Sequence, residues 1–212
     1  CHSFLAHSSL SASTRQAVEQ NLKTSAQVLS HALKQSTTIF ISLGTAWYYS
    51  QLSNSAFVAN CHKIPSREFA KHLSSVAELK QDLTEIIRLV NKVNPECKLV
   101  FTVSPVKHLK DGLVENSRSK AHLLTSVHNV IAETGRDCMY FPSYELVVDE
   151  LRDYRFYTPD LAHPSPTAIR FIWQKLTSVY MHQSTLAVLK EVEAVQTGLQ
   201  HKAFNPSSLA HQ

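Results

Sequence analysis

Three short stretches of the chain are continuously apolar and rich in β-branched or aromatic residues. They cover residues 37–43, 98–103 and 138–141, and each stops at a glycine or at a turn that contains proline. Continuous apolar runs of this length suit strands that are covered on both faces, as in parallel sheets. We therefore predict three strands of a buried parallel sheet.

The segments around these runs have a helical pattern, with apolar residues three or four positions apart. The predicted helices cover residues 13–35, 66–94, 117–134 and 184–200. Alternation of helices with buried strands is typical of an α/β fold with a doubly wound parallel sheet. We expect one domain over residues 1–182, followed by a C-terminal helix and a frayed tail over 183–212, with irregular structure after Phe204.

Polar residues gather directly after the first two predicted strands. Gly44 and Thr45 follow the first, and Ser104 and His108 follow the second. In open parallel sheets, ligands bind at the carboxyl ends of the strands. A glycine there allows close approach of a ligand, and a backbone N–H could bind an oxyanion. The same residues also suit ordinary turns, so the pattern alone leaves both interpretations open.

A further polar group, Asn60-Cys61-His62, follows the first cluster along the chain. Neighbouring residues of an extended chain point to opposite sides, which argues against Cys61 and His62 as a nucleophile and its base. A buried structural cysteine is the better interpretation. Asn60 and His62 would lie on the same side of an extended chain and are candidates for substrate contact.

The sequence Asp160-Leu161-Ala162-His163 precedes a predicted helix start. An aspartate three residues before a histidine can accept the Nδ1–H of the imidazole, which leaves Nε2 free to take a proton from a hydroxyl nucleophile. Ser165 and Pro166 suit the N-cap and first position of a helix that begins near Thr167. Tetrapeptides of this kind also occur on ordinary surfaces, so the assignment depends on the surrounding residues.

Alternating charges come shortly before this loop. Such patterns usually form structural ion pairs, and we expect a network among four side chains: Asp149, Arg152, Asp153 and Arg155.

Composition restricts the function classes. The 212 residues are 43% hydrophobic and 18% charged, with a net charge of +4 spread along the chain, which does not indicate a nucleic-acid partner. No apolar run approaches the roughly 18 residues of a membrane span. The four cysteines and twelve histidines match no zinc pattern. We therefore expect no metal, no cofactor and, without a visible signal peptide, a cytoplasmic protein.

Taken in order, these motifs resemble the GSCFA family, which belongs to the SGNH/GDSL-type hydrolase superfamily. The matching segments are LGTAW, NCHKIP, TVSPV-x-H with the following DG and SK, YFPSYE, and DYRFY-x-x-D-x-x-HPS. The resemblance covers residues 1 to about 180. It implies a three-layer α/β/α, flavodoxin-like fold and ester hydrolysis or acyl transfer, with Asp160 and His163 serving a serine nucleophile.

Two departures from that pattern affect the expectation. The Gly-Ser-Cys-Phe-Ala run that gives the family its name is absent, and the chain begins with Cys1. We therefore expect a fragment whose first strand and nucleophile lie upstream, inactive by itself. The superfamily's G-x-N-D oxyanion block also has no literal counterpart, and Gly44-Thr45 is the nearest candidate.

The leading hypothesis is an esterase that acts on a small-molecule or saccharide ester. His163 would be the general base and Asp160 its orienting group. Six residues would line the pocket: Gly44, Thr45, Asn60, His62, Ser104 and His108. Two alternatives are a saccharide O-acyltransferase that uses the same pair of residues, and a binding module that keeps the fold without catalysis.

Overall fold

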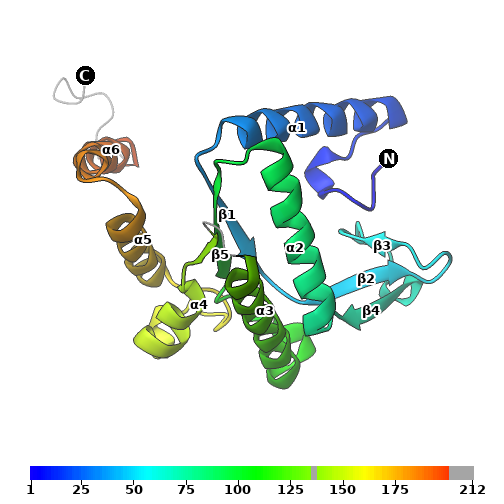
Figure 1. Cartoon of the computed structure of the whole chain (residues 1–212). Helices are drawn as coiled ribbons and strands as arrows, with labels where there is room; N and C mark the ends of the chain where they lie inside the picture. The colour runs from blue at the N-terminus through cyan, green and yellow to red at the C-terminus, as the bar shows by residue number, and fades with distance from the viewer. Residues whose placement is uncertain (135–137, 201–212) are drawn as a thin grey trace, which may run out of the picture. The chain divides into compact units, whose positions relative to one another are not determined.

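The computed structural model describes residues 1–134 and 138–200. The chain divides into two compact units, Cys1–Ser165 and Pro166–Gln212 (Figure 1). The second unit contains the helices α5 (Pro166–Tyr180) and α6 (Gln183–Gln200). The division expected after residue 182 lies between these two helices, and the tail expected after Phe204 lies outside the described residues. No helix in the described part of the chain is both long and apolar enough to cross a membrane.

The first unit is built on a parallel sheet of three strands in the order β1-β5-β6. These are β1 (Thr38–Leu43), β5 (Lys98–Val103) and β6 (Cys138–Tyr140), and they confirm the three strands predicted from the apolar runs. β1 and β5 pair from Thr38 with Lys98 to Leu43 with Val103, so their carboxyl ends are level. The mixed α/β fold with a parallel sheet is thus confirmed.

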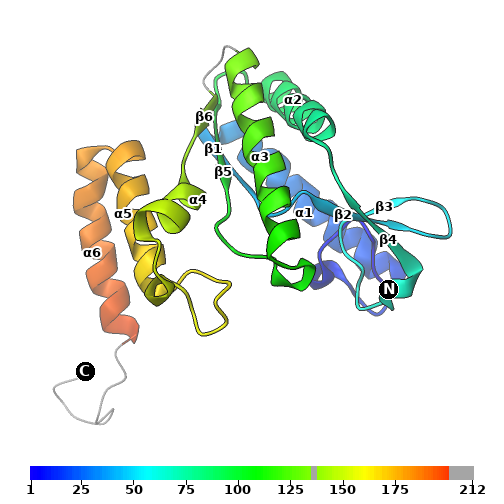
Figure 2. The same ribbon diagram turned by 90° about the horizontal axis from the view of Figure 1, so that it is seen from below.

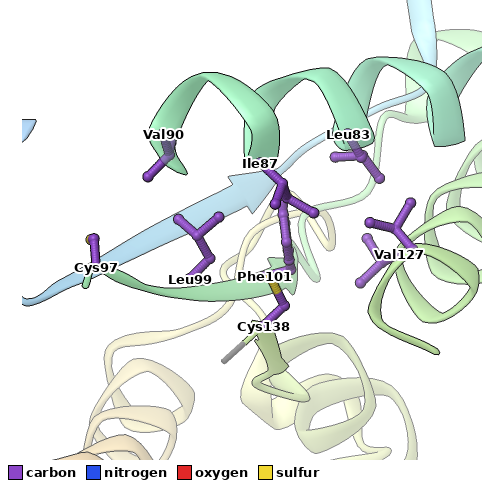
Figure 3. Close-up of a cluster of buried hydrophobic side chains, with 9 residues drawn as sticks. Leu83, Ile87, Val90, Cys97, Leu99, Phe101, Val127 and Cys138 are labelled. Carbon is purple, nitrogen blue, oxygen red and sulfur yellow. The ribbon is translucent and has the colours of Figure 1, made fainter. Parts of the chain in front are cut away.

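Helices lie on both faces of this sheet, and its central strand β5 is buried whereas β1, which was expected to be buried as well, is partly exposed. On one face, α2 (Val76–Val93) and α3 (Leu113–Thr134) pack side by side, as Figures 1 and 2 show. Their apolar stripes meet Leu99 and Phe101 of β5 in a closely packed core (Figure 3). On the opposite face, Thr102 of β5 and Ser143 of the short helix α4 (Ser143–Glu145) share a hydrogen bond between their hydroxyls at 2.6 Å. α1 (Arg15–Gln35) packs against α2.

A second, antiparallel sheet was not predicted from the sequence. It consists of β2 (Trp47–Gln51), β3 (Phe57–Val58) and β4 (Phe69–Leu73), in the order β3-β2-β4. The helix expected over residues 66–94 is therefore wrong in its first third. Ser75 and Glu78 form a capping box that starts α2 at Val76, and the residues before it pair with β2 instead.

The remaining elements are short. Five helical segments connect the main elements: η1 (Ser8–Leu10), η2 (Ser66–Glu68), η3 (Leu109–Asp111), the π-helix η4 (Leu146–Leu151) and η5 (Tyr154–Phe156). Lys71 of β4 forms an ion pair with Asp111 of η3, and its Nζ lies 4.6 Å from the centre of the Trp47 ring. The antiparallel sheet is thereby attached to the loop that follows β5.

Candidate functional site

The loop that carries Asp160 and His163 is a closed turn. Thr158 donates its backbone N–H to the His163 carbonyl at 2.8 Å, and Tyr157 and Pro164 form an isolated β-bridge across the base of the loop. Leu161, at the tip, has a φ of 57°, which is uncommon for a branched side chain. These contacts close the loop through bonds among its own residues.

Within this turn, Asp160 and His163 form the expected pair. Oδ2 of Asp160 lies 2.6 Å from Nδ1 of His163. Oδ1 of Asp160 accepts three further hydrogen bonds, from the Thr158 hydroxyl at 2.6 Å and from the backbone N–H groups of Ala162 and His163 at 2.9 and 3.1 Å. These donors hold the pKa of Asp160 far below its usual range. An ionised Asp160 requires a proton on Nδ1 of His163, so Nε2 of the neutral ring is an acceptor.

The pair is open to solvent, since the side chains of His163 and Asp160 are 60% and 51% exposed. A small molecule in solution can therefore reach both side chains.

The strand-end cluster around Gly44 and Ser104 is held together by a buried lysine. Lys120 of α3 is 1% exposed, and its Nζ donates to the carbonyls of Gly44 and Ser104, both at 2.6 Å. Burial lowers the pKa of Lys120 to about 8. This side chain joins the carboxyl ends of β1 and β5 and fixes the two predicted site segments relative to each other.

Ser119, the neighbour of Lys120, organises the turn after β1. Its hydroxyl accepts the Ala46 backbone N–H at 2.7 Å and lies 3.1 Å from the Thr45 hydroxyl, which in turn accepts the Trp47 N–H. The N–H groups of Ala46 and Trp47 are therefore already engaged. Any oxyanion contact from this turn would have to come from another donor.

His108 lies against Gly44. A Cβ atom added at Gly44 would come 3.8 Å from Nε2 of His108, which is ordinary contact. Asn116 accepts the backbone N–H of His108 at 2.9 Å. Burial and then the nearby Lys120 lower the pKa of the His108 ring, although Asp111 and the Gly44 carbonyl act in the opposite direction. His108 is thus biased toward the neutral form, in which it can both donate and accept.

The segment after β5 also reaches the Asp160–His163 turn. Lys107 donates its backbone N–H to the carbonyl of Ala162 at 3.0 Å. Through this bond and the Lys120 bridge, the structure connects Gly44, Ser104 and the Asp160–His163 pair, which are far apart in the sequence.

Asn60 and His62 have other partners. The Asn60 side chain accepts the His62 backbone N–H at 2.8 Å, and the φ of His62 is 49°, so this segment is a turn and not the extended chain we expected. The His62 ring lies 2.7 Å from the Ser3 carbonyl and stacks on His2 at 4.3 Å between centroids. In the described part of the chain, their contacts are to one another and to residues 2–4.

The expected ion-pair network before the turn is reduced to one pair. Arg155 contacts Asp153 at 3.1 Å. Arg152 takes no part, and in the described part of the chain it has no carboxylate within ion-pair distance. Glu145, which comes shortly after the third predicted strand, accepts the Tyr140 hydroxyl at 2.8 Å.

Sequence reasoning did not assign the bridging role of Lys120, although a signal was present. The buried stripe of α3 includes Asn116, Lys120, Leu123, Val127 and Val130. A lysine on such a stripe must find acceptors inside the protein, since burying an unpaired charge is costly. The strand-end carbonyls are those acceptors.

The fold and the site define a mixed α/β protein with a carboxylate–histidine pair on a turn beside the carboxyl ends of its parallel strands. The model of the GSCFA family matches residues 1–176, and the chain belongs to that family. The search of curated proteins found no match.

Proposed function

We propose that this protein is the histidine-bearing part of a serine ester hydrolase of the SGNH type. The observation that carries the proposal is the 2.6 Å contact between Asp160 Oδ2 and His163 Nδ1, with three further donors on Asp160. An aspartate held in this way stays ionised and fixes the ring orientation. It also stabilises the imidazolium that forms when Nε2 takes a proton.

In the proposed reaction, Nε2 of His163 removes the proton of a serine hydroxyl as its oxygen attacks the ester carbonyl. The imidazolium then gives that proton to the leaving alcohol, and an acyl-enzyme remains. Water hydrolyses the acyl-enzyme by the same route and restores the serine. Residues 1–212 lack the Gly-Ser-Cys-Phe-Ala run in which the family pattern places the serine, so the test uses the full-length gene product.

Gly44, Thr45, Ser104 and His108 are the proposed substrate contacts. The Lys120 bridge and the Lys107–Ala162 hydrogen bond support this part of the proposal, because they connect these residues to the Asp160–His163 turn. Asn60 and His62 stay predictions from the sequence.

An acyltransferase would use the same Asp160–His163 pair, with an alcohol in place of water as the acyl acceptor. The engaged N–H groups of Ala46 and Trp47 favour the other alternative, a binding module, because they are not free to stabilise an oxyanion.

Replacement of the base separates these possibilities. In the full-length protein, His163→Ala should lower kcat for p-nitrophenyl acetate by about 10⁴-fold or more, since the nucleophile loses its proton acceptor. Labelling of a serine by a fluorophosphonate should fall with it. His31→Ala, on the exposed face of α1, is the matched control and should behave as the parent.

An unchanged rate in a folded His163→Ala protein would overturn the assignment of the base. If the full-length parent neither hydrolyses esters nor reacts with the fluorophosphonate, the result would favour the binding module. Acyl transfer to an added saccharide, at the expense of hydrolysis, would favour the acyltransferase.

A further inference from the structure

A cavity of about 260 Å³ lies beside the Asp160–His163 turn, inside the first unit. Its wall contains Lys107, whose backbone N–H is bonded to Ala162, and Tyr157, at the base of the turn. The volume is slightly below the roughly 300–1,000 Å³ of typical ligand sites. It therefore suits one chemical group or ring of a substrate.

Two cationic side chains line this cavity without carboxylate partners. Nζ of Lys107 lies 3.9 Å from the centre of the Tyr157 ring and 4.9 Å from that of Tyr154, so the two rings hold it in place. Arg152 is the second cation. Within the described residues neither forms an ion pair, and Asp153, the neighbour of Arg152 in the sequence, pairs with Arg155.

The backbone at Arg152 supports a functional role. Arg152 ends the π-helix η4 with a φ of 46°, in the left-handed region that non-glycine residues rarely adopt. Strained conformations of this kind, and π-helical turns themselves, gather at functional sites.

The other lining residues contribute no negative charge. They include Asn116, Ser117 and Tyr144, which can hydrogen-bond, and Pro105 and Val148, which are apolar. Burial raises the pKa of the Tyr144 and Tyr157 hydroxyls, so both stay neutral at neutral pH. Asp149 and Glu145 lie near enough to raise the Tyr144 pKa further, but neither lines the cavity.

We propose that this cavity binds a negatively charged group of the substrate, a carboxylate or a phosphate, through Lys107 and Arg152. The guanidinium offers paired donors that match either group, and the lysine adds a point charge. The inference rests on the proposed esterase function, which it extends to anionic esters, with the hydrogen bond from Lys107 to Ala162 joining the cavity to the turn that bears the base.

Paired substrates test the inference in the full-length protein. Mono-p-nitrophenyl glutarate and p-nitrophenyl valerate differ by a charge on the acyl side, and 4-acetoxybenzoate and 4-tolyl acetate differ on the alcohol side. We expect kcat/KM to favour the anionic member of at least one pair by about tenfold or more. Lys107→Met and Arg152→Gln should each reduce that ratio severalfold, and Lys107→Arg should keep it.

Lys110→Met is the matched control, because it removes the same charge from an exposed position on η3. It should leave the ratio unchanged. Equal ratios for the parent and both cavity variants would overturn the inference, and so would an equal loss in Lys110→Met.

A binding measurement separates this inference from the proposed reaction. NMR titrations of the His163→Ala protein with 4-hydroxybenzoate, phenyl phosphate and neutral 4-hydroxybenzamide need no turnover. Tighter binding of an anion than of the amide, with that preference lost in Lys107→Met, would support the anion-binding cavity even if the parent hydrolyses no ester. Whichever of the two anions binds more tightly would identify the group as a carboxylate or a phosphate. Equal binding of all three ligands would reject the subsite even if the parent is an active esterase.

Discussion

Lys120 and His163 are two basic side chains beside the same end of the parallel sheet, and they are held in opposite ways. Lys120 is 1% exposed and bonded to carbonyls 76 and 16 positions away in the sequence. His163 is 60% exposed, and its carboxylate partner is three positions away. The buried amine connects two strands, whereas the exposed imidazole belongs to a local turn. Stability should therefore depend on Lys120, and the proposed ester hydrolysis on the His163 turn.

The largest effect expected from this contrast is that of Asp160→Asn. The asparagine carbonyl can still accept the backbone N–H groups, but its amide would face Nδ1 of His163 with a donor. The ring would then carry its proton on Nε2, the wrong tautomer for a base. We expect kcat for p-nitrophenyl acetate to fall by about 10³- to 10⁴-fold in the full-length protein, with a melting temperature close to that of the parent.

A large drop in melting temperature with little loss of rate would contradict this prediction. It would show that the turn serves the fold and not the reaction.

Lys120→Met should instead act mainly on stability. Methionine fills a similar volume but leaves the Gly44 and Ser104 carbonyls without their buried donor. An unsatisfied buried acceptor costs roughly 1–3 kcal/mol, so we expect a loss of about 2–4 kcal/mol in the free energy of unfolding. Urea denaturation of the full-length protein measures it. Lys23→Met, an exposed lysine of α1, provides the control and should change stability by less than about 0.5 kcal/mol.

Equal stabilities for the two methionine variants would show that the Lys120 bridge contributes nothing to folding. The contrast with His163 would then have no energetic basis.

The smallest expected effect is a pH dependence of the difference in the free energy of unfolding between the parent and Lys120→Met. Between about pH 8, where folded Lys120 loses its proton, and its unfolded pKa near 10.4, the unfolded chain binds one more proton than the folded chain. Stability therefore rises with pH in this window, by up to about 1.4 kcal/mol per pH unit. Urea midpoints measured at pH 7, 8, 9 and 10 should show that the parent becomes more stable relative to the variant as the pH rises. A constant difference across this range would mean that the Lys120 pKa is not lowered by burial.

The parallel sheet was predictable because its strands read as continuous apolar runs, although only the central strand β5 is buried on both faces and Phe40 of β1 is 43% exposed. Residues 66–75 were assigned wrongly for a related reason. Phe69 and Leu73 are four positions apart, a spacing that also suits a helix, although Ser75 and Glu78 carry a capping signal that places the start of α2. The antiparallel sheet depends on pairing between β2 and β4, which are separated by about twenty residues, and no local pattern encodes such a pairing.

The candidate site also contains residues whose contacts could be predicted from the sequence and others whose contacts could not. The Asp160–His163 contact could be predicted because it forms within a four-residue turn. The position of His62 could not, since a left-handed backbone turns its ring onto the stack with His2. The ion pairs predicted for Arg152 also failed, because the end of the π-helix η4 places its side chain along the cavity wall.

The sequence by itself determined the family, the strands of the parallel sheet and the local carboxylate–histidine pair, because these depend on continuous motifs, on burial patterns and on contacts within a few residues. Only the tertiary structure decided that Lys120 joins the ends of β1 and β5, that Lys107 meets the Asp160–His163 turn, and that Lys107 and Arg152 share a cavity. Each of these contacts links residues that are far apart in the sequence, so no local pattern encodes it.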